Sequence, residues 1–122
     1  VSNVVNMSYM LWGATSFNRD LSSWDVSNVE NMEGMFVGNS SFDGDISSWN
    51  VSSVVRMRAM FQGAASFNGD ISSWNVSKVV IMNTMFQGAT SFGRQLGGAW
   101  ATSKADKYKM FYKSPGTIAG KM

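Results

Sequence analysis

Residues 51–75 read VSSVVRMRAMFQGAASFNGDISSWN, and this stretch decides the fold because the chain repeats it without insertion or deletion through Phe92. The landmark residues recur every 25 positions, as in Trp24, Trp49 and Trp74 and in the Met pairs Met7/Met10, Met32/Met35, Met57/Met60 and Met82/Met85. A strict period of this length is typical of supersecondary units that stack into a solenoid. The sequence therefore predicts an elongated stack of units rather than a closed globule.

The period divides the chain into two parts. Residues 1–100 hold four repeats (1–25, 26–50, 51–75 and 76–100), and residues 101–122 form a degenerate fifth unit and tail. The chain opens with Val1, the first position of a repeat, and not with Met. We therefore interpret it as a fragment or processed form that lacks its earlier repeats.

Each repeat is predicted to contain a short helix and a short strand. In the third repeat, the apolar residues stand at helical spacing over residues 54–64. Apolar and polar residues alternate around 49–51 and 74–76, which indicates strands. One unit cannot bury its apolar side alone, so the recurring apolar positions are expected to stack into interior columns. We interpret the Met residues as flexible core filler, because they lie on the apolar side of the predicted helix, and not as an exposed copper-binding array.

The fifth unit departs from the pattern and predicts a C-terminal cap. Ala99 stands where the next Trp is due and Trp100 is displaced by one, so the Trp column is expected to end at Trp74. Met110 and Phe111 keep the period. Residues 101–112 are predicted to form a helix, which the sequence Ser114-Pro115-Gly116 ends. Its basic face, from Lys104, Lys107, Lys109 and Lys113, would give the stack a polar end.

Composition argues against an enzyme. The chain has no Cys and no His, which excludes disulfides, thiol chemistry, the usual zinc sites and any His-based general base. We expect no catalytic residue, no cofactor and no metal. The column of Asp20, Asp45 and Asp70 is interpreted as turn residues that bind local backbone amides. Calcium binding by this column is the open alternative, although the dense ligand spacing of known calcium loops is missing.

Charge is distributed unevenly along the chain. Residues 1–93 carry four basic and seven acidic side chains, whereas residues 94–122 carry six basic and one acidic. The basic C-terminal helix is therefore expected either to cap the stack only or also to contact an acidic partner or an anionic surface. No apolar run is long enough to span a membrane. Arg56 and Arg58 are too few, and lack interleaved aromatic residues, for nucleic-acid binding.

Positions that vary between repeats indicate which surface is free to bind a partner. Stacked positions hold the same residue type in every unit, whereas the variable ones are expected on the outward side of the predicted helix. Val5, Val55 and Val80 lie near this edge and are either part of an interface or partly buried under neighbouring coils. Tyr9 and Trp12 are expected either to bind a partner or to pack against earlier repeats. The candidate partner-binding residues are Tyr9, Trp12, Arg56, Arg58 and Ile81 on this surface, with Lys104, Lys107, Lys109 and Lys113 in the fifth unit.

The repeat unit resembles that of a known family. Residues 67–77 read Phe-Asn-Gly-Asp-Ile-Ser-Ser-Trp-Asn-Val-Ser, and this motif is similar to the repeat of BspA-like bacterial surface proteins, a leucine-rich-repeat variant found in mycoplasma lipoproteins and in marine algae. The resemblance covers residues 1–92. It implies a right-handed solenoid of the leucine-rich-repeat type, a role in adhesion or protein binding, and no catalytic residues. Residues 93–122 depart from the motif, with Gly93 at the Asn position and Gln95 at the Asp position.

Two functions follow as expectations. The first is a non-enzymatic protein-binding solenoid that is part of a surface or adhesion protein at the cell surface or outside the cell. The alternative is a structural accessory subunit docked in a larger assembly, such as an algal photosynthetic membrane complex, in an organelle lumen or at a membrane periphery. A chain that always co-purifies with a complex would favour the alternative. An enzyme that uses the Asp column with a metal is the weakest interpretation.

Overall fold

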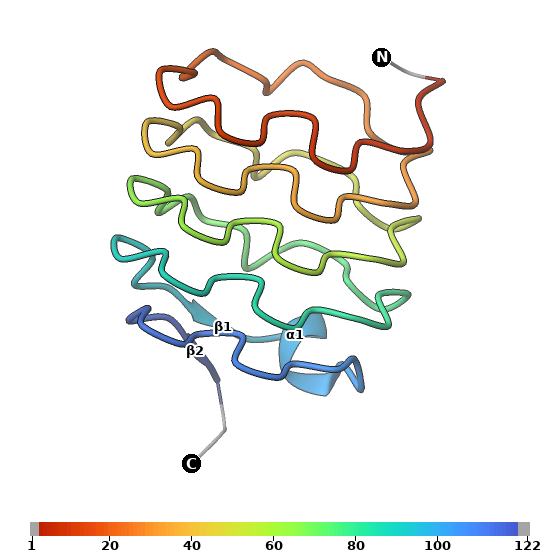
Figure 1. Cartoon of the computed structure of the whole chain (residues 1–122). Coiled ribbons are helices and arrows are strands. Elements are labelled where there is room, and N and C mark those ends of the chain that lie inside the picture. Colours follow the sequence, from red (N-terminus) through yellow and green to blue (C-terminus); the bar gives the residue numbers. More distant parts are fainter. Residues whose placement is uncertain (1–2, 120–122) are drawn as a thin grey trace.

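The computed structural model describes residues 3–119 as five coils stacked one above the next around a continuous core (Figure 1). Regular secondary structure is sparse in these residues: strand β1 (Gln95–Leu96), helix α1 (Ala99–Thr102) and strand β2 (Thr117–Ile118). β1 and β2 pair in parallel, in the register Gln95 to Thr117 and Leu96 to Ile118. The predicted repetition is confirmed, but the coils themselves are mostly irregular.

A ladder of backbone hydrogen bonds joins successive coils along one face. It starts at parallel bridges between Asn6, Asn31, Arg56, Ile81 and Asp106, one residue from each coil. Beyond the bridge, alternate amides donate to the next coil, as Leu11 N does to Met35 O at 2.9 Å. The amides between them donate to the carbonyl three residues back, as Met10 N does to Met7 O at 3.3 Å. These overlapping turns occupy residues 8–13, 33–38, 58–63, 83–88 and 108–113, which we call the turn runs; their outward surface is the turn face.

The turn runs replace the predicted helices, so the prediction of strand–helix units is wrong. A helix needs each amide to bond four residues back, whereas half of these amides bond the neighbouring coil. The backbone also enters the left-handed region twice in each run, as at Ala59 (φ 57°) and Gly63 (φ 70°), and this conformation ends a right-handed helix. The strands predicted around 49–51 and 74–76 are wrong too, because the coils pair through the ladder on another side of the unit.

The core consists of columns of identical side chains, as predicted. Phe36, Phe61 and Phe86 are fully buried and stack with ring centroids 5.2 and 5.5 Å apart. A second Phe column, which includes Phe67, lies beside the first, and the centroids of Phe61 and Phe67 are 4.2 Å apart. The interpretation of Met as core filler is confirmed, because the inner Met residues are wholly buried: Met32, Met35, Met57, Met60, Met82 and Met85.

The Trp column continues one coil further than the sequence predicts. Trp100, on α1, stacks on Trp74 with ring centroids 6.4 Å apart. Its Nε1 donates to Ile71 O at 3.0 Å, just as Trp74 Nε1 donates to Ile46 O at 3.1 Å. The expected break after Trp74 is therefore wrong. Gly98, with φ 52°, and the single turn of α1 absorb the extra residue, so the indole reaches the position that Ala99 holds in the sequence pattern.

The predicted C-terminal capping helix is also wrong. α1 covers four residues, and 108–113 form a fifth turn run instead. The ladder explains this outcome, because Thr84 N donates to Tyr108 O at 2.9 Å and Phe86 N donates to Met110 O at 2.8 Å. Lys109 takes the left-handed conformation (φ 51°), which a helix over 101–112 would forbid. The fifth unit thus continues the stack, in the register that the sequence indicated.

One buried polar group leads to a stability prediction. Asn39 is fully buried where the first, third and fourth coils have Ala, and its Nδ2 has no hydrogen-bond partner in the part of the chain that the structure describes. Its Oδ1 accepts Phe42 N at 3.1 Å and, in a longer bond of 3.3 Å, Ser41 N, whereas Phe67 N donates to the carbonyl of Ala64. We expect Asn39→Ala to raise the free energy of unfolding by about 1 kcal/mol, because it removes the unpaired amide and lets the backbone bond form. Urea denaturation measures this change. Asn75→Ala should have the opposite sign, because it removes the bond from Ser77 N to Asn75 Oδ1.

Candidate binding surface

The turn face of the first three coils carries an aromatic hollow. Tyr9 and Trp12 meet edge to face with ring centroids 6.4 Å apart, and their side chains are 45% and 66% exposed. Tyr9 lies against Gly34 of the second coil, where an added Cβ would overlap its ring. The hollow has a volume of about 470 Å³, and its lining comprises Tyr9, Trp12, Val37, Arg58, Ala59 and Gln62. It therefore combines an apolar floor with polar groups at its rim.

Arg58 connects this hollow to the second coil. Its Nη1 lies 3.4 Å from Glu33 Oε1, in a pair that remains largely open to solvent. Exposed pairs of this kind contribute little to stability, so the guanidinium remains available to a partner. The structure thus brings three of the predicted residues, Tyr9, Trp12 and Arg58, into one site.

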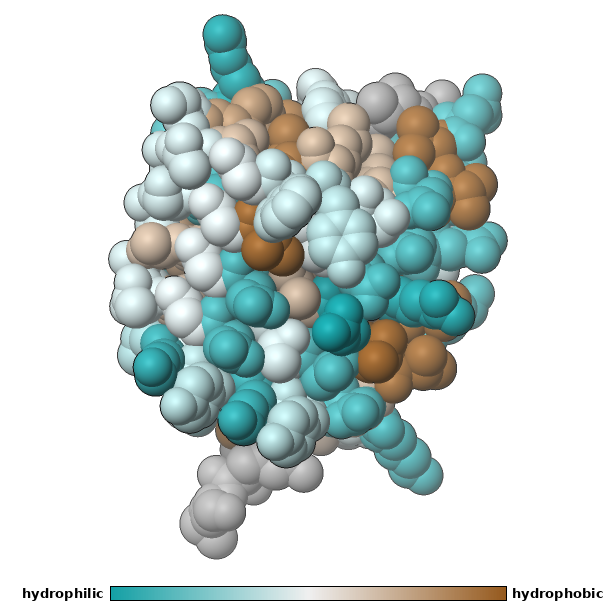
Figure 2. Space-filling model, in the orientation of Figure 1, coloured by the Kyte–Doolittle hydropathy of each residue, from teal (hydrophilic) through white to brown (hydrophobic). Residues whose placement is uncertain are grey.

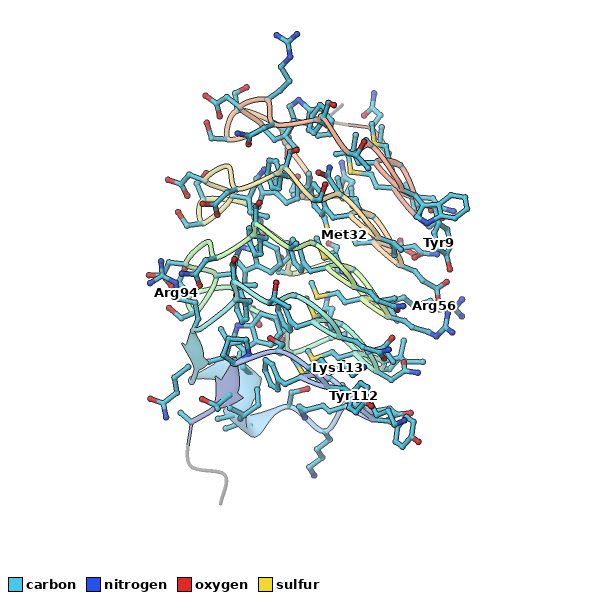
Figure 3. The ribbon with its side chains drawn as sticks, turned by 60° about the vertical axis from the view of Figure 1, so that its left-hand side comes forward. Tyr9, Met32, Arg56, Arg94, Tyr112 and Lys113 are labelled. Atoms are coloured by element: carbon cyan, nitrogen blue, oxygen red, sulfur yellow. The ribbon has the colours of Figure 1, made fainter. Side chains whose placement is uncertain are left out.

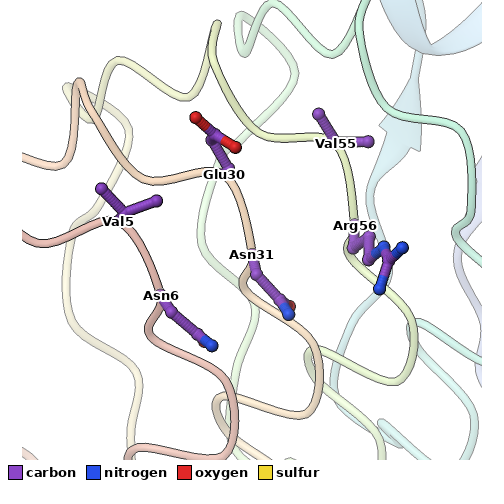
Figure 4. Close-up of a pocket in the computed structure, with 6 residues that line it drawn as sticks. All are labelled: Val5, Asn6, Glu30, Asn31, Val55 and Arg56. Atoms are coloured by element: carbon purple, nitrogen blue, oxygen red, sulfur yellow. The ribbon is translucent and has the colours of Figure 1, made fainter.

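Arg56 and Ile81 belong to a different part of the surface. They occupy the bridge column, in which Asn6, Asn31 and Arg56 point to the same side of three successive coils (Figure 4). This column borders a second hollow of about 310 Å³, whose lining comprises Val5, Asn6, Glu30, Asn31, Val55 and Arg56. Figure 3 places Tyr9 and Arg56 along one edge of the stack and Arg94 on the opposite edge.

The exposed fractions of Val5, Val55 and Val80 distinguish between the two interpretations of these residues, a free surface position or partial burial under neighbouring coils. Val5 is 48% and Val80 60% exposed, whereas Val55 is half-buried between its neighbours. In the view of Figure 2, apolar side chains interrupt a mainly polar face at its upper end and right-hand edge. Val5 and Val80 are therefore free on the surface, and Val55 is partly covered.

The four Lys residues of the fifth coil do not share a helix face. Lys107 Nζ donates to Ser103 O at 2.6 Å, which holds this side chain close to the backbone. Lys109 and Lys113 lie over the ring of Tyr112, at 4.9 and 5.4 Å from its centroid. Lys104 is exposed. The sequence analysis missed Tyr112 and Tyr108, which are 46% and 65% exposed, although Tyr112 holds the repeat position of Trp12.

The Asp column makes the local hydrogen bonds that the sequence predicts. Asp45 Oδ1 accepts Ser47 N at 2.9 Å and Ser47 Oγ at 2.6 Å, and Asp70 does the same with Ser72. These hydroxyl and amide donors lower the pKa of both carboxyls below the usual 3.8. Within residues 3–119, no group of three or more His, Cys, Asp or Glu side chains is placed to hold a metal ion.

The lowered pKa values predict acid sensitivity. A carboxyl whose folded pKa is depressed adds stability above its unfolded pKa, near 3.8, and this stability is lost as the pH falls through the folded pKa. We expect the urea concentration at the unfolding midpoint to decrease as the pH is lowered through this range. In the double variant Asp45→Asn/Asp70→Asn this decrease should be smaller, because Asn accepts a hydrogen bond from the same amide without titrating. An unchanged pH profile in the double variant would show that other groups cause the loss.

The stacked coils define a repeat protein, and the hollow lies on its exposed turn face. No helix within residues 3–119 has the length and apolarity that crossing a membrane requires. The family model described as "Mycoplasma protein of unknown function, DUF285" matches residues 1–51 and 22–119. The chain therefore belongs to this family, a repeat family related to BspA-like and leucine-rich-repeat-variant proteins. No curated protein and no solved structure matches the chain.

Proposed function

We propose that the chain is a non-enzymatic protein-binding solenoid of the leucine-rich-repeat-variant type, part of a surface or adhesion protein at the cell surface or outside the cell. The observation that carries this proposal is the aromatic hollow on the turn face. Trp, Tyr and Arg dominate the energetic centres of protein interfaces, and Tyr9, Trp12 and Arg58 lie together there. Family membership supports a repeat scaffold without naming a ligand.

The stack itself does not require these side chains. Trp12 is 66% exposed, and the same position is held by Val37, Gln62 and Gln87 in the next three coils. The position of Tyr9 is held by Gly34, Ala59 and Thr84. Large exposed aromatic groups at positions that tolerate small or polar residues are better explained by binding than by packing.

A displayed library of random peptides, selected on the immobilised chain, tests the proposal. We expect the enriched peptides to bind the chain and to lose at least about tenfold in affinity, or 1.4 kcal/mol, on Trp12→Ala or Arg58→Ala. Tyr108→Ala is the matched control, because it removes an exposed aromatic group at a distance from the hollow. The proposal fails if no peptide is enriched, or if the hollow variants bind as well as the control.

The alternative function, an accessory subunit docked in a larger assembly at an organelle membrane or in its lumen, has one observation in its favour. The fifth coil presents Tyr108 and Tyr112 beside Lys109 and Lys113, a second exposed aromatic and basic cluster. Cross-linking in the native source tests this function. Cross-links from Lys109 or Lys113 to one constant partner in a large complex would support it, and a monomer released without a partner would contradict it.

A further inference from the structure

The bridge column presents side-chain hydrogen-bond donors to solvent. Asn31 Oδ1 accepts the amide of Glu33 at 2.9 Å, and Asn6 Oδ1 accepts the amide of Ser8 at 2.8 Å. Because only the oxygen of a carboxamide can accept a hydrogen bond, this local bond fixes the orientation of the side chain. The Nδ2 group of Asn31 is left over, and it donates to no acceptor within the described residues. A donor is therefore held in place before any ligand binds.

Arg56 continues the column in the third coil and brings a positive charge. Parallel bridges join Asn31 to Arg56 and Arg56 to Ile81, so these three residues lie side by side on successive coils. The Arg56 guanidinium is exposed, and it makes no hydrogen bond or ion pair with the part of the chain that the structure describes. Figure 4 shows Arg56 and Asn31 pointing to the same side. Since a coil lies on each side of Arg56, this exposure is lateral.

Apolar side chains adjoin these donors on the third and fourth coils. Val80 is 60% exposed, and its amide donates to Val55 O at 2.9 Å, so the two residues lie on neighbouring coils. Val55 and Ile81 are half-buried. Together with Asn31 and Arg56, these three residues form what we call the bridge-column surface. All five belong to coils with a neighbour above and below, so the surface is a lateral one that combines donors with an apolar strip.

The charges around this surface favour a single carboxylate over a polyanion. Residues 1–93 carry four basic and seven acidic side chains, so this part of the chain repels nucleic acid, which proteins bind through several cations. One guanidinium beside a neutral amide donor instead matches one carboxylate, which Arg binds through two parallel N–H groups. Glu30 lines the same hollow as Arg56. Figure 4 shows Glu30 pointing away from Asn31 and Arg56, which leaves their donors to an external carboxylate.

From these observations we propose that the bridge-column surface binds a segment of a partner protein in which an Asp or Glu side chain stands next to apolar residues. The carboxylate accepts hydrogen bonds from the Arg56 guanidinium and from Asn31 Nδ2. The apolar residues of the segment cover Val55, Val80 and Ile81. This binding site goes beyond the function proposed above, because none of its residues lines the aromatic hollow.

Fluorescence anisotropy with labelled peptides tests the proposal on the whole chain. The probes are short peptides with blocked termini, each with one aspartate or glutamate among valine, isoleucine and serine, and each has a twin with asparagine or glutamine in its place. We expect acidic probes that bind about tenfold or more tightly than their amide twins. Arg56→Ile should remove this preference. The variant should fold, because Ile81 holds the same position in the fourth coil, and circular dichroism checks this.

Two further substitutions also copy residues from other coils. Asn31→Asp keeps the local bond, since Asp106 Oδ1 accepts Tyr108 N at 3.0 Å in the same way. It replaces a donor by a negative charge and should also remove the preference for acidic probes. Glu30→Val introduces the residue that the next coil has at this position, and it should tighten the binding of acidic probes by removing a like charge. Arg94→Gln is the matched control, because it removes a positive charge from the opposite edge of the stack (Figure 3) and should change nothing.

The absence of any acidic probe that binds more tightly than its amide twin would overturn the proposal, as would a preference that survives in Arg56→Ile and Asn31→Asp. Stronger binding of acid-free peptides with a free C-terminal carboxylate would contradict it by assigning the ligand to a chain terminus. Binding of heparin alone would contradict it by assigning the ligand to a polyanion. Probes that lose affinity for Trp12→Ala but not for Arg56→Ile would lie in the aromatic hollow, a result that supports the function proposed above and overturns this site.

Discussion

Phe61→Ala is expected to lower the free energy of unfolding by about 3–5 kcal/mol, the usual loss when a buried Phe is truncated. Phe61 is fully buried and stacks on Phe36, Phe67 and Phe86. The middle coil of a stack contacts a coil on each side, so the cavity weakens two interfaces at once. In a stack of repeats, stability is approximately the sum of terms from each unit and from each interface between neighbouring units. Because Phe61 contributes to two such interfaces, we expect its truncation to lower the free energy of unfolding more than a truncation at the end of the stack.

Urea denaturation followed by Trp fluorescence measures the effect. Leu11→Ala is the matched control, because Leu11 holds the same position in the first coil, is only half-buried and has one neighbouring coil. We expect a clearly smaller loss there. Equal losses at the two positions would mean that the middle of the stack is no more strongly coupled than its end, contrary to the packing described above.

Trp100→Ala is expected to cost a similar amount, about 3–5 kcal/mol. The indole is fully buried, stacks on Trp74, contacts Phe86 and donates a hydrogen bond to Ile71 O. Its removal leaves a cavity and takes away one of the two hydrogen bonds that Ile71 O accepts, the other coming from Trp74 N. Because α1 (Ala99–Thr102) leads directly from the fourth repeat into the fifth coil, we expect the fifth coil to loosen first, before the repeats above it unfold.

Trp12→Ala is the matched control for Trp100→Ala, since it removes the same side chain from a site where it is 66% exposed. We expect its effect on the free energy of unfolding to stay within about 0.5 kcal/mol. Hydrogen exchange should show faster exchange at the amides of Thr84 and Phe86 in Trp100→Ala, because these donate to the fifth coil. Unchanged exchange at both would show that α1 does not hold that coil in place.

The candidate site was predictable in part. Variation between repeats pointed to Tyr9, Trp12 and Arg58, and the structure brings these three residues together. It assigns Arg56 and Ile81 to the bridge column, which a repeat pattern alone does not distinguish from the turn face. Tyr108 and Tyr112 went unnoticed because the predicted helix placed them on a cap, although their repeat positions are those of Ser8 and Trp12.

The helix prediction failed for a physical reason. Apolar residues at steps of three and four suit a helix, but they suit overlapping turns equally well. Whether a helix or a run of turns forms depends on the acceptors available to the backbone amides. Every second amide donates to a carbonyl of the neighbouring coil, as Ala59 N does to Asn83 O at 3.1 Å. The recurring Gly, such as Gly63 with φ 70°, marks a left-handed turn inside the unit and not the end of a helix.

The sequence by itself determined the stacking and the composition of the core, because a period without insertions forces identical side chains such as Phe36, Phe61 and Phe86 into register. Only the tertiary structure decided the backbone path within each coil, the recovery of the Trp column by Trp100 and the turn run in place of a terminal helix. The reason is that these features depend on hydrogen bonds between residues 24 to 29 positions apart, as from Phe61 N to Met85 O and from Trp100 Nε1 to Ile71 O. Local propensity does not contain such bonds, and they form only when one coil lies on the next.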